Sequence, residues 1–152
     1  MAHARETVTI DRPVEVVFEF VLNGMNNPLW QPLVMDVQRL ADTPGGPSFK
    51  QGLRGSAGGR IEGEYTVVET QTNQLIGFEL TAGTARRTGR ITFEAIGSQT
   101  RVGFALEAQT RGLARLVDPL LGRALQNEVS ALHNLKGFLE GQQHVLYEHR
   151  FG

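Results

Sequence analysis

The sequence contains no cysteine among its 152 residues. Without cysteine there are no disulfide bonds, no thiolate nucleophile, and no zinc or iron–sulfur site held by thiolate ligands. Long apolar runs are also missing, since no apolar stretch approaches the roughly 20 residues that a membrane-spanning helix needs. We therefore expect a soluble protein with no stable membrane insertion.

The sequence also lacks an excess of charge of either sign. Its 15 basic and 16 acidic residues give a formal net charge of −1. No broad positive field gathers phosphate groups, so we expect no nucleic-acid partner. The adjacent pair Arg86 and Arg87 lies among glycine and threonine and is predicted to be a solvated hairpin tip. Residues 1–12 lack the apolar segment of a secretory signal, so the expected location is the cytoplasm.

Motifs for metal, nucleotide and hydrolytic chemistry are absent as well. No H-x-x-x-H or H-x-E pair involves the histidines, which are His3, His133, His144 and His149. There is no G-x-S-x-G nucleophile elbow, and no glycine cluster matches G-x-x-x-x-G-K-[ST] or G-x-G-x-x-G. We therefore expect no metal site and no cofactor.

The N-terminal part of the chain predicts one strand and two short helices. Polar and apolar residues alternate over 6–11, as in a strand with one face on a core. Asp11 is the expected N-cap, two residues before Pro13, of an amphipathic helix that ends near residues 23–24. Residues 27–30 predict a second helical turn with a proline at its first position.

From residue 34 to about 112 the chain has the pattern of a hairpin meander. Turns are expected at 44–47, 72–73, 83–84 and 97–98. Residues 90–95 and 101–107 alternate most clearly, which predicts strands with one dry face. Several glycines inside or beside these strands predict bulges or bends in a coiled sheet. They are Gly52, Gly55, Gly58, Gly59, Gly63, Gly77 and Gly103.

The last predicted element is a long helix. It starts near Asp118 and Pro119, which suit an N-cap and a first helical position, and ends at Gly141. Its leucines form one apolar stripe, which needs a large apolar surface to rest on. The stripe consists of Leu121, Leu125, Leu132, Leu135 and Leu139. We therefore predict one domain over 1–141 and a C-terminal tail over 142–152.

The local sequence of four stretches, which together span nearly the whole chain, resembles that of a known protein superfamily. They are residues 8–18, 27–30, 97–102 and 132–140. Together with the order of strand, two short helices, six-strand meander and long helix, they resemble the START-like or SRPBCC superfamily. That group includes birch-pollen-allergen-like proteins, lipid-transfer START domains and polyketide cyclase/dehydratase-like proteins. The resemblance implies an α+β helix-grip fold, in which a seven-stranded curved antiparallel sheet wraps the C-terminal helix and leaves a ligand cavity between them.

One carboxylate interrupts the leucine stripe. On a helical wheel Glu128 falls near the middle of that stripe. Burial of a carboxylate in an apolar interior raises its pKa, which is how a general acid or a ligand-orienting group is often made. The alternative is a structural role, with Glu128 at the cavity mouth or paired with an arginine such as Arg90 or Arg101.

Two aromatic residues are further candidates for ligand contact. Tyr65 shares one face of its predicted strand with Ile61, Gly63 and Val67, and on a concave face its phenol would hydrogen-bond a ligand carbonyl or hydroxyl. The alternative is a core tyrosine with a hydrated tip. Trp30, the single tryptophan, either contacts the ligand at the entrance that the resemblance implies or fills the gap between helices and sheet.

We predict that the protein binds or carries a small hydrophobic or amphipathic ligand in the cavity. The residues expected near this ligand are Trp30, Tyr65, Phe78, Phe93, Phe104, Glu128 and Leu132. The first alternative is a polyketide cyclase/dehydratase-type enzyme, in which Glu128 or Tyr65 moves protons beside a bound carbonyl. The second is a homo-oligomeric interaction protein, such as a homodimer joined through a sheet edge or the C-terminal tail.

Overall fold

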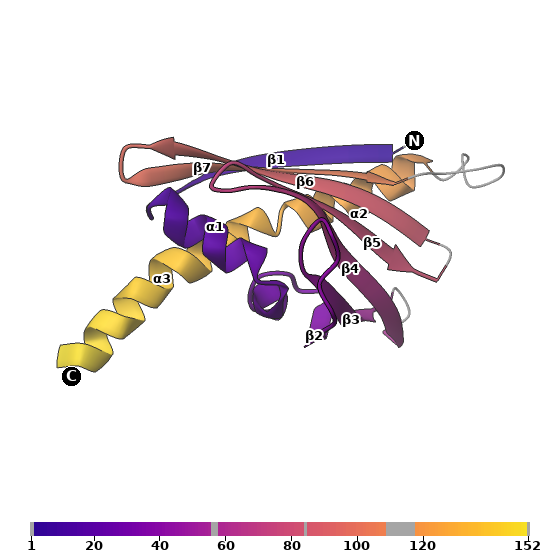
Figure 1. The fold of residues 1–152 in the computed structure, drawn as a ribbon, viewed down its shortest axis with the longest axis horizontal. Helices are drawn as coiled ribbons and strands as arrows, with labels where there is room; N and C mark the ends of the chain where they lie inside the picture. The colour runs from indigo at the N-terminus through magenta and orange to yellow at the C-terminus, as the bar shows by residue number, and fades with distance from the viewer. Residues whose placement is uncertain (1, 56–57, 84, 109–117, 152) are drawn as a thin grey trace.

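A computed structural model describes residues 2–55, 58–83, 85–108 and 118–151 (Figure 1). The elements along the chain are β1 (Ala2–Ile10), α1 (Val14–Leu22), the 3-10 helix η1 (Gly24–Leu29), β2 (Val34–Arg39), β3 (Ser48–Arg54), β4 (Arg60–Gln71), β5 (Leu75–Ala82), β6 (Ala85–Ile96), β7 (Gln99–Ala108), α2 (Asp118–Val129) and α3 (Leu132–Phe151). Their order confirms the predicted strand, two short helices and hairpin meander, but the C-terminal helix is in two parts.

The strands form one antiparallel sheet in the order β1-β7-β6-β5-β4-β3-β2. Strands β2 to β7 follow one another as hairpins. The last strand, β7, also pairs with the first strand, β1, which therefore forms one edge of the sheet. Figure 1 shows the sheet curving over α1, α2 and α3, which all lie on its concave side. The predicted α+β helix-grip fold with a seven-stranded curved sheet is confirmed.

The core lies between the concave face and the helices. The alternating residues of β6 and β7 point inward as predicted, and Phe93, Val102 and Phe104 are all buried. The Phe93 ring meets that of Phe18 on α1 edge-on, with 5.2 Å between centroids. The described members of the leucine stripe are buried as well, namely Leu125, Leu132, Leu135 and Leu139. The side chain of Leu121 lies outside the described residues.

The predicted single C-terminal helix is wrong in two respects. It breaks between Val129 and Leu132, where the Ser130 hydroxyl donates to the Asn127 carbonyl at 2.6 Å and competes with helical bonding. It also continues through Gly141 to Phe151. A glycine ends a helix when it adopts the left-handed conformation, which Gly141 does not adopt. Inside a helix a glycine only lowers stability, by about 1 kcal/mol relative to alanine, so the helix can continue past it.

Local details of the N-terminal half also differ from expectation. The residue that precedes α1 is Pro13 and makes no side-chain cap, so Asp11 is not the N-cap. Helix η1 begins at Gly24, after the Asn23 side chain accepts a hydrogen bond from the Met25 N–H at 3.1 Å. The main-chain N–H of Asp11 instead donates to the Glu140 carboxylate on α3, a contact that local spacing does not reveal.

The extra residues of the bulges are not glycines, but two of the predicted glycines, Gly52 and Gly77, are the cross-strand partners at the register shifts. The strand register shifts between Val34 and Asp36 in β2 and between Val67 and Glu69 in β4. An inward-facing glycine serves close packing instead. A Cβ at Gly89 on β6 would lie 2.1 Å from the Phe78 ring on the neighbouring strand, so this ring requires glycine beneath it.

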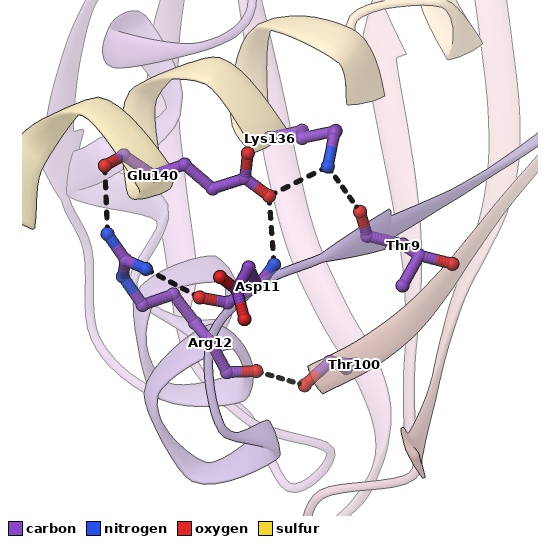
Figure 2. A network of polar contacts seen from close by, with 6 residues as sticks. All are labelled: Thr9, Asp11, Arg12, Thr100, Lys136 and Glu140. Atoms are coloured by element: carbon purple, nitrogen blue, oxygen red, sulfur yellow. Dashed lines mark hydrogen bonds and ion pairs between the residues drawn. The ribbon is translucent and has the colours of Figure 1, made fainter. Parts of the chain in front are cut away.

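A polar network ties α3 to the corner between β1 and α1 (Figure 2). The Glu140 carboxylate accepts from the Asp11 main-chain N–H at 2.8 Å and from Lys136 Nζ at 2.7 Å. Lys136 Nζ also donates to the Thr9 carbonyl at 2.6 Å. The Arg12 guanidinium donates to the Glu140 carbonyl at 2.8 Å. The network therefore joins the end of the first strand to a segment almost 130 residues later in the chain.

We predict that Glu140→Gln lowers the free energy of unfolding at pH 7 by about 1 kcal/mol, the usual size of such a partly exposed charged contact. The Lys136 ammonium and the Asp11 N–H hold the pKa of Glu140 below its usual 4.5. The stabilisation is thus present above pH 4.5 and disappears as the pH falls through the pKa of the folded state. Urea denaturation at several pH values measures this difference.

Glu107→Gln is the matched control, because Glu107 is an exposed strand residue remote from this network. Equal stability of wild type and Glu140→Gln at pH 7 would contradict the stabilising role of the Glu140 network.

Candidate functional site

A cavity of about 730 Å³ lies between the concave face of the sheet and α2. This volume is within the usual range for small-molecule sites, roughly 300–1,000 Å³. Its walls come from β3 to β7, from α2 and from the segment between η1 and β2. The apolar lining includes Leu53, Ile61, Phe78, Leu80, Phe104 and Leu106. The polar lining includes Gln31, Gln51, Arg54, Tyr65, Arg87, Asn127 and Glu128.

The structure brings four of the seven predicted ligand residues to this cavity: Tyr65, Phe78, Phe104 and Glu128. The other three, Trp30, Phe93 and Leu132, are buried in the core and are not part of its lining. Trp30 instead packs edge-on against Phe104 with 6.0 Å between centroids. Helix α1 covers the end of the concave face that carries Phe93. Periodicity identified Phe93 and Leu132 as inward-facing, but it cannot separate a filled part of the interior from a hollow one, and for Trp30 the structure has the second of the two predicted roles, packing in the core.

Aromatic rings form one connected wall of the cavity. The Tyr65 and Phe78 centroids are 4.8 Å apart, and the Phe78 and Phe104 centroids are 6.1 Å apart. On the other side, Phe49 lies 6.1 Å from Tyr65. Phe49, Tyr65 and Phe78 come from the neighbouring strands β3, β4 and β5, and the contact between Phe78 and Phe104 on β7 crosses β6 at Gly89, which has no side chain. A flat apolar molecule would find an extended aromatic surface here.

Glu128 on α2 forms an ion pair with Arg87 on β6 inside the cavity wall. Their side chains are 20% and 25% exposed. Burial raises the pKa of Glu128, and the positive charge of Arg87 opposes this rise. The pair is therefore a partly desolvated acid beside a fixed cation, which is the type of arrangement that active sites and ligand-orienting sites use.

The partner of Glu128 was not the one expected from the sequence. Neither Arg90 nor Arg101 pairs with it, and Arg101 instead lies 3.6 Å from Glu94. Arg87 is not at a solvated hairpin tip, because β6 already begins at Ala85. Strand alternation then sends Arg86 to the outer face, where it binds Glu79 at 2.7 Å, and Arg87 to the inner face.

Tyr65 lies in the middle of the aromatic wall and is 4% exposed. Burial raises the pKa of its phenol, so the hydroxyl is neutral at physiological pH. The hydroxyl makes no hydrogen bond within the described part of the chain, but its oxygen is not sealed off like the Trp30 nitrogen, because it reaches the open cavity. The Trp30 indole N–H is buried without a partner among the described residues, and it does not line the cavity.

Sequence reasoning missed Gln51. This residue is 1% exposed, lines the cavity from β3 and accepts a hydrogen bond from the Asn27 amide at 2.8 Å. The available signal was its place two residues after Phe49, which puts both on the same face of a strand. A glutamine in a short strand with few apolar residues was nevertheless indistinguishable from a surface residue.

The described residues contain no group of three or more acidic or histidine side chains that could hold a metal ion. None of the described helices is both long and apolar enough to pass through a membrane.

The chain belongs to the polyketide cyclase/dehydrase and lipid-transport family, whose pattern matches residues 1–140. This finding and the fold confirm the resemblance to START-like proteins. Family and fold together indicate ligand binding or a function of the polyketide cyclase/dehydrase type, and the family indicates a hydrophobic ligand. No curated protein matches the chain at a significant level.

Solved structures share the fold at low sequence identity. A START superfamily protein from Mycobacterium smegmatis has a TM-score of 0.71 at 19% identity, and the alignment covers 91% of this chain and 99% of that one. The Zhui aromatase/cyclase from Streptomyces sp. R1128 has a TM-score of 0.76 at 16% identity, with 91% and 93% covered. The di-domain aromatase/cyclase StfQ from the steffimycin pathway has a TM-score of 0.77 at 13% identity, with 94% and 52% covered.

We predict that Arg87→Met raises the pKa of Glu128 further, because the cation that favours the carboxylate is removed while burial remains. Nuclear magnetic resonance titration of the side-chain carboxyl carbon measures this pKa. The variant should lose roughly 1–3 kcal/mol of stability at pH 7, less than the 3–5 kcal/mol typical of a fully buried pair. The loss of stability should grow as the pH rises above 4.5, the usual pKa of a glutamate, because only the ionised carboxylate is destabilised by burial without a partner.

Arg86→Met is the matched control for this experiment, because it removes the adjacent arginine on the outer face. The double variant Arg87→Met/Glu128→Gln should recover most of the lost stability, since no unpaired charge remains in the wall. A double variant as unstable as Arg87→Met would contradict the ion-pair explanation.

Proposed function

We propose that this protein binds and carries a small hydrophobic or amphipathic molecule in the cavity between the sheet and α2. The observation that carries this proposal is a cavity of about 730 Å³ whose wall is mostly apolar and holds few polar groups. Transfer of apolar ligand surface from water into such a space is worth roughly 25 cal/mol per Å². The polar groups would orient one end of the molecule, as they do in most small-molecule sites.

The entrance supports the same function. Leu33, between η1 and β2, and Ile61 on β4 both line the cavity, yet they are 46% and 44% exposed. Residues that belong to the cavity wall and also face water mark its mouth. Because these entrance residues are apolar, an apolar ligand can enter the cavity through contacts with apolar side chains.

We predict that Ala124→Trp closes the cavity, because Ala124 projects from α2 into the lining and an indole there would fill much of the space. The test uses the fluorescent apolar probe 8-anilinonaphthalene-1-sulfonate (ANS), with fatty acids and polycyclic aromatics as competitors. Wild type should bind ANS, and Ala124→Trp should weaken this binding about tenfold or more.

Gln126→Trp is the matched control, since it places the same side chain on an exposed position of α2 outside the lining. Equal ANS affinity of Ala124→Trp and wild type would overturn the proposed site. Indifference of the wild type to ANS and to the whole panel would overturn the proposed function.

A cyclase/dehydratase-type enzyme is the second candidate, and the ion pair in the cavity wall favours it. Glu128 has a raised pKa, faces the cavity and is 20% exposed, so its carboxylate is close enough to a bound molecule to take up a proton. A proton removed from the carbon next to a ligand carbonyl would pass to the Glu128 carboxylate. Zhui and StfQ, which share the fold, are described as aromatase/cyclases.

For this second candidate we predict that Glu128→Gln abolishes turnover of a poly-β-ketoacyl thioester while an uncharged polycyclic aromatic still binds as in the wild type, because the amide fills the same space but accepts no proton. Mass spectrometry of the products, which detects the loss of water, measures turnover. The wild-type rate should fall as acid protonates the carboxylate. Turnover that survives in Glu128→Gln would exclude this role of Glu128.

A further inference from the structure

Two buried side chains face the cavity with hydrogen-bond donors that the described residues leave unused. Gln51 on β3 is 1% exposed and Tyr65 on β4 is 4% exposed, and both belong to the lining. The hydrogen bond from Asn27 goes to the Gln51 oxygen, so the Gln51 Nε2 group keeps its protons for another acceptor. The Tyr65 hydroxyl has no partner within the described ranges. Neither donor atom is sealed in the protein, because among the described residues only the Trp30 indole nitrogen is a fully buried polar side-chain atom without a partner; both donors therefore reach the open cavity, where a ligand can accept from them.

The sheet register places these two donors side by side. Phe49 pairs with Tyr65 and Gln51 pairs with Gly63, so Gln51 and Tyr65 are diagonal neighbours on the same face of adjacent strands. Diagonal neighbours have backbones roughly 7–8 Å apart, a distance that long side chains bridge. Gly63, directly opposite Gln51, has no side chain of its own, and the Leu53 side chain, which also lines the cavity, lies over it. One ligand atom can therefore be reached from both.

The neighbouring Asn27 fixes the direction of the Gln51 amide. Asn27 lies in η1, is 1% exposed, and its Nδ2 group donates to Gln51 Oε1 at 2.8 Å. This contact uses the acceptor end of the glutamine, and the donor end is the part that remains. Asn27 is thus a positioning residue, and the pair presents a donor to the cavity rather than an acceptor.

The charges around the cavity determine which acceptor fits. Arg87 is already neutralised by Glu128, and Arg54 is exposed, so the lining formed by the described residues offers no free buried cation to balance a ligand carboxylate at these donors. A ligand hydroxyl would accept their hydrogen bonds but add a donor of its own that also needs a partner. A carbonyl oxygen accepts two hydrogen bonds through its two lone pairs and adds no donor.

We propose that Gln51 Nε2 and the Tyr65 hydroxyl form a two-donor site for a carbonyl oxygen of the ligand. The inference rests on the proposed binding function and adds the substrate class, an apolar ketone or related uncharged carbonyl compound. The body of such a molecule would lie along Phe78 and Phe104, which continue the wall from Tyr65. The site selects the ligand by its oxygen and requires no chemical step.

The test compares 9-fluorenone with fluorene, two flat molecules of one skeleton that differ in the carbonyl, by displacement of bound ANS. Wild type should bind fluorenone about tenfold more tightly than fluorene, since each added hydrogen bond is worth a few-fold in affinity. Tyr65→Phe and Gln51→Met should each reduce this preference to about threefold, and the double variant should lose it. Fluorene affinity should be the same in all four proteins.

Tyr65→Phe removes a single oxygen without a described protein partner, so it tests the site even if Gln51→Met fails to fold. Gln38→Met is the matched control, because Gln38 is an exposed glutamine on β2 outside the lining. Equal wild-type affinities for ketone and hydrocarbon, or displacement of ANS by neither, would overturn this inference alone. Tighter binding of 9-fluorenol than of fluorenone would overturn the donor assignment. Failure to bind ANS as well would contradict the proposed function.

Discussion

The structure depends on the burial of one leucine stripe against the inside of a curved sheet. Leu125 on α2 and Leu132, Leu135 and Leu139 on α3 rest on this concave face, and each is at most 3% exposed. The contact is incomplete over part of the curved sheet. Helix α1 fills the end that holds Phe93, whereas α2 spans the other end and leaves a cavity of about 730 Å³ beneath it. The hollow is thus a consequence of how the apolar surfaces fit together.

The two C-terminal helices are held by polar contacts of different kinds. Helix α3 is fixed to the corner between β1 and α1 by the network around Glu140 (Figure 2). Helix α2 is joined to the sheet across the cavity by the Glu128–Arg87 pair. The break at Ser130 lets each part follow its own support. Because Glu128 both holds α2 and lines the cavity, stability and ligand recognition share one residue.

Two pairs of polar side chains in the cavity wall differ in what they offer a ligand. Glu128 and Arg87 neutralise each other, so they impose no net charge on a bound molecule. Gln51 and Tyr65 are neutral and have donors to spare. This combination favours an uncharged apolar molecule with an acceptor oxygen over a fatty acid or a phosphate ester. It is also compatible with the proton transfer next to a ligand carbonyl that the second candidate function requires.

Local periodicity determined the elements, the buried face of β6 and β7, the leucine stripe and the inward position of Tyr65, Phe78, Phe104 and Glu128, because each depends on residues close in sequence. Only the tertiary structure decided what those faces meet. The partner of Glu128 depends on where β6 begins, since a shift of one residue would exchange Arg86 for Arg87. The role of Gln51 depends on Asn27, 24 residues earlier. Spacing specifies which side of an element is apolar, but whether that side is packed or hollow depends on surfaces that only the folded chain brings together.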